Sequence, residues 1–234
     1  MLATAACAGP PYQTDDPEPV ALHKYEINIA TQQTLTAAGR VGTLPGVEIN
    51  YGGAPDLQLH AALPLALARP ASGGTRFGLG DVEFGAKYRF LQETDTTPML
   101  AIYPTYIAPT GNDARGLGNG RSQILLPLWA QKSSGRWTVD GGLGYLINRA
   151  SGSRDNWFAG VLVQRRVSER MSLGAELFHR TRPSNDLPAS TGFNVGTTFD
   201  FDEHHHLLLS VGEGLGQRQQ TNKVSSYVAF QITN

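Results

Sequence analysis

The sequence predicts an all-β protein, a transmembrane antiparallel up-and-down β-barrel of about twelve strands. Three observations predict this class. Apolar and polar residues alternate with a period of two over most of the chain, the connections between the alternating runs are in turn short and long, and aromatic residues gather at the ends of the runs. Alternation over such lengths is typical of strands and not of helices. One barrel domain is expected over residues 23–234.

The alternating runs set the expected strands. In the clearest run, residues 82–90, an apolar residue stands at every even position, and a charged residue or glycine at every odd one. Each run is ~9–12 residues long, the length that a tilted strand needs to cross a bilayer. The outward rows are expected to begin at Tyr25, Val47, Leu57, Val82, Met99, Ile124, Trp137, Trp157, Met171, Phe193, Leu207 and Val224. The fifth row, assigned to the outer face, is Met99, Ala101, Tyr103, Thr105 and Ile107.

The connections follow the pattern of bacterial barrels, with short turns on one side and longer loops on the other. Short connections are expected at residues 52–56, 91–98, 133–136, 168–170 and 202–204. Longer loops rich in glycine, serine and asparagine are expected at residues 34–40, 69–80, 109–121, 148–156, 181–191 and 213–223. Aromatic residues near both ends of the runs, such as Tyr25, Trp137 and Trp157, are typical of girdles at the two membrane interfaces.

Composition excludes several classes. The 234 residues carry a formal net charge of −1, so there is no basic footprint for nucleic acid. No apolar stretch approaches the ~18–20 residues of a membrane-spanning helix. Cys7 is the single cysteine, which excludes a disulfide within one chain. Residues 1–8 are interpreted as a signal-peptide remnant. Residues 9–22, rich in proline and aspartate, are interpreted as a periplasmic N-terminal leader and a candidate partial plug.

The polar positions of the early runs define one expected wall of the lumen. These inward residues are Glu26, Glu48, His60, Asp81, Glu83, Lys87, Arg89, Asp140, Glu176 and Arg180. One interpretation is structural, because charges of both signs can pair across neighbouring strands and fill a barrel. The other is functional, because a ring of charged side chains can select the solutes that pass.

A second expected wall is apolar. Its residues, assigned to the inner face of the middle runs, are Leu100, Ile102, Tyr106, Leu125, Trp129, Phe158, Leu162 and Phe178. Apolar side chains are unexpected in a lumen, which normally faces water. They either fill a narrow barrel or form a path for small amphipathic or aromatic molecules, since apolar walls with few polar groups are what ligand pockets use.

Two further motifs are better explained by structure than by chemistry. The glycine-rich residues 116–120 lack the following helix of a phosphate-binding loop, so an external loop is expected. Residues 202–206, Asp-Glu-His-His-His, offer metal-binding side chains without a fixed ligand set, so a polar turn is expected. No metal site and no cofactor is therefore predicted.

Several segments resemble a family of proteobacterial outer-membrane proteins known as transporters or as members of the MetA-pathway of phenol degradation. The segments that carry the resemblance are residues 9–19 (GPPYQTDDPEP), 80–90 (GDVEFGAKYRF), 109–111 (PTG), 116–120 (GLGNG) and 199–206 (FDFDEHHH). They are spread over the whole chain. The resemblance implies a transporter in the outer membrane of a Gram-negative bacterium and says little about the substrate.

The leading functional prediction is a non-enzymatic channel or transporter for passive passage of small solutes, aromatic or amphipathic ones included. Its expected partners are outer-membrane lipids, small-molecule solutes and, during biogenesis, the barrel-assembly machinery. Three alternatives stay open: an outer-membrane lipid hydrolase, a purely structural barrel, and a soluble periplasmic β-sandwich that binds a ligand. The hydrolase needs a serine beside a histidine, and His179 is the candidate histidine near the long-loop edge.

Overall fold

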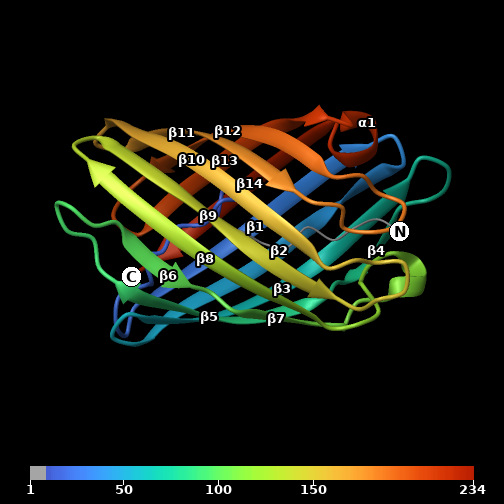
Figure 1. Ribbon diagram of the computed structural model, residues 1–234, viewed down its shortest axis with the longest axis horizontal. Helices are drawn as coiled ribbons and strands as arrows, with labels where there is room; N and C mark the ends of the chain where they lie inside the picture. The colour runs from blue at the N-terminus through green and yellow to red at the C-terminus, as the bar shows by residue number, and fades with distance from the viewer. Residues whose placement is uncertain (1–8) are drawn as a thin grey trace.

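One closed β-sheet forms the molecule (Figure 1). The computed structural model describes residues 9–234, so the expected signal-peptide remnant at residues 1–8, with Cys7, lies outside the described residues. The first strands are β1 (Tyr25–Thr36), β2 (Gly39–Ala54), β3 (Leu57–Pro70), β4 (Arg76–Leu79), β5 (Val82–Leu91), β6 (Met99–Ile102) and β7 (Thr105–Ala108). The remaining strands are β8 (Gln123–Ser134), β9 (Trp137–Asn148), β10 (Asn156–Ser168), β11 (Met171–Arg180), β12 (Ser190–Asp200), β13 (His205–Gly216) and β14 (Val224–Thr233).

The fourteen segments occupy twelve strand positions. β4 and β5 pair with successive parts of β3, and β6 and β7 both lie between β5 and β8. Each pair is therefore one strand with a break, at Gly80–Asp81 and at Tyr103–Pro104. Every neighbouring pair is antiparallel, and β1 closes the ring against β14. The predicted barrel of about twelve strands is confirmed, and the soluble sandwich is excluded.

Apolar side chains cover the outside of the barrel. Ile29 pairs with Val47 on β2 and with Phe230 on β14, and all three lie on the outer face. Phe84, Val161 and Leu177, on three different strands, are each 53 % exposed. Such a continuous apolar surface is unstable in water and suits contact with acyl chains. The period-two pattern therefore determines three things together: where the strands lie, which face of each is outside, and that this face contacts lipid.

The fifth predicted row lies on the inner face of the barrel, so its assignment to the outer face is wrong. Ala101 is 0 % and Ile107 5 % exposed, whereas Ile102 is 44 % and Tyr106 46 % exposed. Ile102 pairs with Tyr88, and Tyr106 pairs with Phe84, so both belong to the outer face. Leu100, two residues before Ile102 on the same strand, shares that face. Both faces of this strand are apolar, so periodicity could not choose between them, and a one-residue slip inverts every side chain.

The connections alternate as predicted over most of the barrel. The long loops lie at residues 109–122, 149–155, 181–189 and 217–223, and two of them contain the short helices η1 (Asp113–Arg115) and α1 (Arg218–Thr221). The connection at residues 71–75, expected to be long, is shorter than the one at residues 92–98, expected to be short. The expected long loop at residues 34–40 is wrong. Thr36 pairs with Gly39, and Ala37 and Ala38 alone join β1 to β2. Gly39 has a φ of +135°, which glycine adopts readily, so the hairpin can close in two residues.

Neither α1 nor η1, the helices within residues 9–234, is long and apolar enough to cross a membrane.

Candidate functional site

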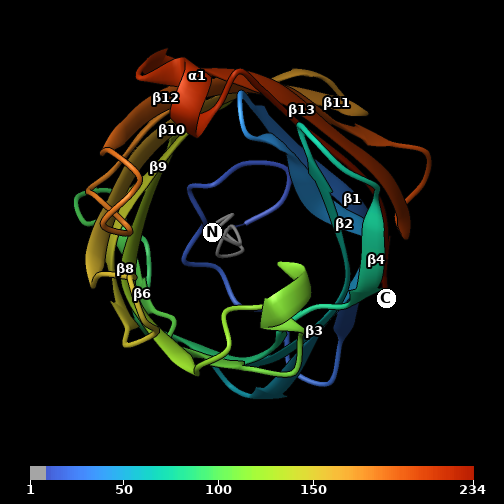
Figure 2. The same cartoon turned by 90° about the vertical axis from the view of Figure 1, so that its right-hand side faces the viewer.

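The N-terminal segment, defined as residues 9–22, runs through the interior of the barrel (Figure 2). The backbone N–H groups of Gln13 and Thr14 both donate to one carboxylate oxygen of Glu176 on β11, at 2.8 and 2.6 Å. Lys87 on β5 forms ion pairs with Asp15 at 3.1 Å and with Asp16 at 3.7 Å. The segment is therefore held from two walls, by a wall anion on its backbone and by a wall cation on its side chains.

Glycines on three adjacent strands make room for this segment. A Cβ atom on Gly160 of β10 would overlap the hydroxyl of Thr14, and one on Gly174 of β11 would overlap the hydroxyl of Tyr12. A Cβ atom on Gly196 of β12 would lie 3.0 Å from the ring of Tyr12. Tyr12 and Thr14 are buried as a result. We call this surface the glycine trough; its role could not be inferred from the strand pattern, where each glycine fits either face.

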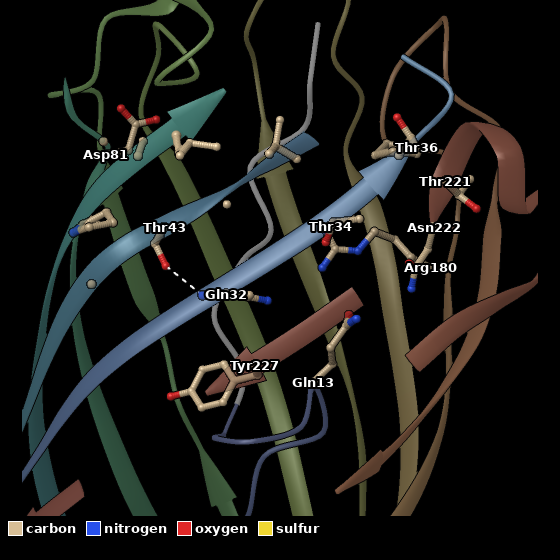
Figure 3. A pocket seen from close by; sticks show the side chains of 18 of the residues that line it. Gln13, Gln32, Thr34, Thr36, Thr43, Asp81, Arg180, Thr221, Asn222 and Tyr227 are labelled. Atoms are coloured by element: carbon tan, nitrogen blue, oxygen red, sulfur yellow. Dashed lines mark hydrogen bonds between the residues drawn. The ribbon is translucent and has the colours of Figure 1, made fainter. Parts of the chain in front are cut away.

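The interior on the loop side of the segment is a cavity of about 270 Å³, here the loop-side cavity. Gln13 lies at its base, Arg180 at mid-height, and Thr36 and Thr221 near its mouth (Figure 3). Its lining is mostly apolar and includes Phe178, two residues before Arg180 on β11, and Leu187 and Pro188 from the loop that follows β11. The loop of residues 109–122 bends over the mouth, where Leu117 is 1 % exposed and packs on Ala66 and Ala68.

On the other side of the segment lies the turn-side cavity, of about 630 Å³. It is strongly acidic: its lining includes six carboxylates, one lysine and one histidine, namely Asp15, Asp16, Glu18, Glu26, Glu48, Glu83, Lys87 and His60. Asn50 donates to Glu26 at 3.1 Å and to Glu48 at 3.0 Å, and its amide oxygen lies 2.8 Å from Nδ1 of His60. Amide donors between the carboxylates reduce their mutual repulsion and hold them in place.

Glu48 and Glu83 line both cavities. Both spaces therefore border on the same part of the wall, where β3 lies between β2 and β5. A solute that crossed the barrel along this wall would move from a largely apolar chamber, past two carboxylates, into a polar one.

All ten predicted polar residues lie on the inner face, but they do not form one ring. The turn-side cavity is lined by Glu26, His60 and Lys87, the loop-side cavity by Asp81 and Arg180, and both cavities by Glu48 and Glu83. Three have other tasks. Asp81 accepts from the backbone N–H groups of Gly111 and Asn119 at 2.9 and 2.7 Å and so fixes the glycine-rich loop, Glu176 holds the N-terminal segment, and Asp140 accepts from Gln164 at 3.0 Å.

Arg89 reaches the turn between β2 and β3. Its guanidinium donates twice to one oxygen of Asp56, at 2.8 Å from Nε and 2.6 Å from Nη2. These hydrogen bonds lower the pKa of Asp56. Asp56 has a φ of +60°, so the charge pair also holds a left-handed turn residue in position.

The predicted apolar wall is present, but with a different membership. Trp129, Phe158 and Phe178 form a buried cluster with Tyr103, which was expected on the outer face. The rings of Phe158 and Phe178 stack at 6.3 Å, and Trp129 meets Phe158 edge-on at 6.2 Å. Leu162 and the half-buried Leu125 also face inwards. Leu100, Ile102 and Tyr106 are corrected to the outer face, as described above.

The weaker motifs acquire structural explanations. The Asp202 carboxylate accepts from the backbone N–H groups of His204 and His205 at 2.8 and 3.0 Å, and these bonds lower the pKa of Asp202. In residues 9–234, no group of three or more histidine, cysteine, aspartate or glutamate side chains could hold a metal ion. His179 lies on the exposed face, and Nδ1 of its ring is 2.8 Å from the hydroxyl of Thr191. A threonine thus occupies the hydrogen-bonding position that a hydrolase would give to its serine.

Comparisons with known proteins agree with this architecture. The family described as "Putative MetA-pathway of phenol degradation" matches residues 31–231. The COG4313 outer membrane channel from Pseudomonas putida F1 is 18 % identical with a TM-score of 0.75, over 94 % of this chain and 98 % of that one. The KdgM porin is 12 % identical with a TM-score of 0.59, over 88 % and 98 %. The translocator domain of the autotransporter NalP from Neisseria meningitidis is 16 % identical with a TM-score of 0.54, over 89 % and 88 %. At these identities the likeness concerns the fold.

Proposed function

We propose, from the premise that this chain belongs to the family of the putative MetA-pathway of phenol degradation, that it is an outer-membrane channel of a Gram-negative bacterium. Small solutes, aromatic and amphipathic ones among them, would cross it passively. The long loops would face the outside and the short turns the periplasm, as in other bacterial barrels. The protein has no catalytic task in this proposal.

The observation that carries the proposal is the open space on both sides of the N-terminal segment. Two cavities of about 270 and 630 Å³ border on Glu48 and Glu83. A purely structural barrel needs no such space, and its lumen would be filled by side chains. The fold by itself does not decide, because the matched structures include a channel, a porin and a translocator domain.

The acidic turn-side cavity adds a selectivity to the proposal. Six carboxylates against one lysine and one histidine favour cations and repel small anions there. The N-terminal segment narrows the lumen beside them, so we expect small conductances and exclusion of polymers. The solutes that pass most readily would be cations and uncharged amphipathic molecules.

Reconstitution in planar bilayers tests the proposal. We expect discrete current steps with a reversal potential shifted towards the cation equilibrium potential under a salt gradient. In liposome swelling, phenol and benzyl alcohol should enter faster than a sugar of similar mass after their entry into protein-free liposomes is subtracted. A bilayer that remains insulating, with no swelling by any solute, would support the structural barrel. Hydrolysis of phospholipid that His179→Ala abolishes would support the hydrolase instead.

A further inference from the structure

One lumen cation has no anionic partner in the part of the chain that the structure describes. Lys87 pairs with Asp15 at 3.1 Å, and Arg89 with Asp56 at 2.6 Å. Arg180, at the end of β11, has neither an ion pair nor a hydrogen bond from its guanidinium within residues 9–234. Within these residues the guanidinium makes a cation–π contact with Phe158, with its central carbon 5.8 Å from the ring centroid. A guanidinium is always charged and carries five N–H donors, so this group has unused binding capacity.

The surroundings of Arg180 are apolar and aromatic. Arg180 lies in the loop-side cavity (Figure 3), and Phe178, Leu187 and Pro188 also line this cavity. Phe178 stacks on Phe158, the ring that Arg180 covers. Gly192 on β12 leaves space for this arrangement, because a Cβ atom there would lie 2.6 Å from Cζ of Phe178. An unpaired cation beside a supported aromatic surface offers both halves of a site for an amphipathic anion.

We propose that Arg180 and Phe178 form a binding subsite for a small aromatic carboxylate, with benzoate as the simplest example. The carboxylate would take two N–H donors of the guanidinium, and the ring would lie against Phe178. A cavity of about 270 Å³ is below the ~300–1,000 Å³ of sites for drug-sized molecules, so one ring is the expected size. The inference rests on the proposed channel function, since it names a ligand of the same lumen.

The other charges of the lumen determine what the bound acid does. Asp81 is occupied by the backbone of the loop at residues 109–122. The turn-side cavity, which Glu48 and Glu83 border, is lined by six acidic side chains and by a lysine already paired with Asp15, so it offers an anion no unpaired cation. Benzoate should therefore dwell at Arg180 and obstruct the cation current, and it should do so when added on the long-loop side.

Calorimetric titration of the folded protein in detergent tests binding without requiring transport. Benzoate, ionised at neutral pH, should bind, whereas the uncharged benzyl alcohol should bind more weakly. Arg180→Gln should weaken benzoate binding by on the order of tenfold or more, as expected when charge-assisted hydrogen bonds are lost. Arg180→Lys should retain part of the affinity, because the charge remains without the planar fork. Arg121→Gln removes an exposed arginine from the same end of the barrel and should change nothing.

Current recordings separate the subsite from the channel. If cation current flows and benzoate blocks the wild type but not Arg180→Gln, both inferences hold. If current flows while benzoate neither binds nor blocks, or acts equally on Arg180→Gln, the subsite is refuted and the channel remains. If no current flows but calorimetry shows Arg180-dependent binding, the channel fails and the subsite stands. Phe178→Leu is the second variant, and it should weaken benzoate more than acetate.

Discussion

The two walls of the lumen hold the same N-terminal segment by opposite means. On the wall of β1–β5, charged side chains project inwards, and Lys87 binds the aspartates of the segment. On the wall of β10–β12, glycines leave a trough and Glu176 binds the backbone of the segment. The first wall recognises side chains, and the second recognises the shape and N–H groups of the main chain. The inner face of a barrel can therefore bind one segment of its own chain specifically in two ways. Some positions provide charged side chains, and others leave space because they are glycines.

Filling the glycine trough should have the largest effect. In a Gly160→Val, Gly174→Val double variant, the new side chains would occupy the positions of Thr14 and the Tyr12 hydroxyl. The N-terminal segment could then no longer dock, and single-channel conductance should rise several-fold. Gly144→Ala is the control, because Gly144 lies on β9, outside the trough, and its Cβ would lie 3.3–3.5 Å from atoms of β8. An unchanged conductance in a correctly folded double variant would contradict the trough as the docking surface.

Removing the charge at either wall tests how much that wall contributes to holding the N-terminal segment. Glu176→Gln leaves a neutral acceptor for the N–H groups of Gln13 and Thr14. The free energy that favours docking of the segment should therefore fall by about 1–3 kcal/mol. Amide hydrogen exchange at residues 13 and 14 should accelerate, and the current should show additional openings. Lys87→Met, at the other wall, should produce similar openings because Asp15 loses its ion pair. Glu213→Gln alters an ion pair with Arg218 at the loop end and is the control. Equal exchange rates in all variants would show that the trough alone retains the segment.

The strand pattern predicted the barrel well and the lumen less well, for a physical reason. A lipid-facing row must be apolar at every second residue, so Phe84 and Tyr88 predict both the strand and its outer face. The inward row has no such rule. Ala101 and Tyr103 are apolar and inward, and Gly160 and Gly174 carry no hydropathy signal although they shape the site. Which inner residues meet depends on register, and pairing of β6 and β7 with β5 settles what local periodicity left open.

The corrected face of β6 and β7 can be tested by paired substitutions. Tyr106 is 46 % exposed on the outer face, whereas Thr105 lines the turn-side cavity. Tyr106→Arg places a charge against lipid and should destabilise the folded barrel by up to ~2–4 kcal/mol, with the smaller values nearer the interfaces. Thr105→Arg places the same charge beside carboxylates and should cost less. Heat-dependent gel mobility and urea unfolding in liposomes measure the difference. A larger loss for Thr105→Arg would restore the register that periodicity suggested.

The smallest expected effect concerns the turn that Arg89 holds. Because hydrogen bonds from Arg89 lower the pKa of Asp56 in the folded protein, this group stabilises the fold at pH values above its unfolded pKa of ~3.9. The contribution should fade as the pH drops below that value and through the lower folded pKa. Asp56→Asn, which tolerates the left-handed φ, should flatten the acid limb of the unfolding curve and leave stability at pH 7 slightly reduced. Asp95→Asn, in an exposed turn at the same end, should leave the curve unchanged. An identical acid limb in Asp56→Asn and the wild type would mean that solvent screens the pair completely.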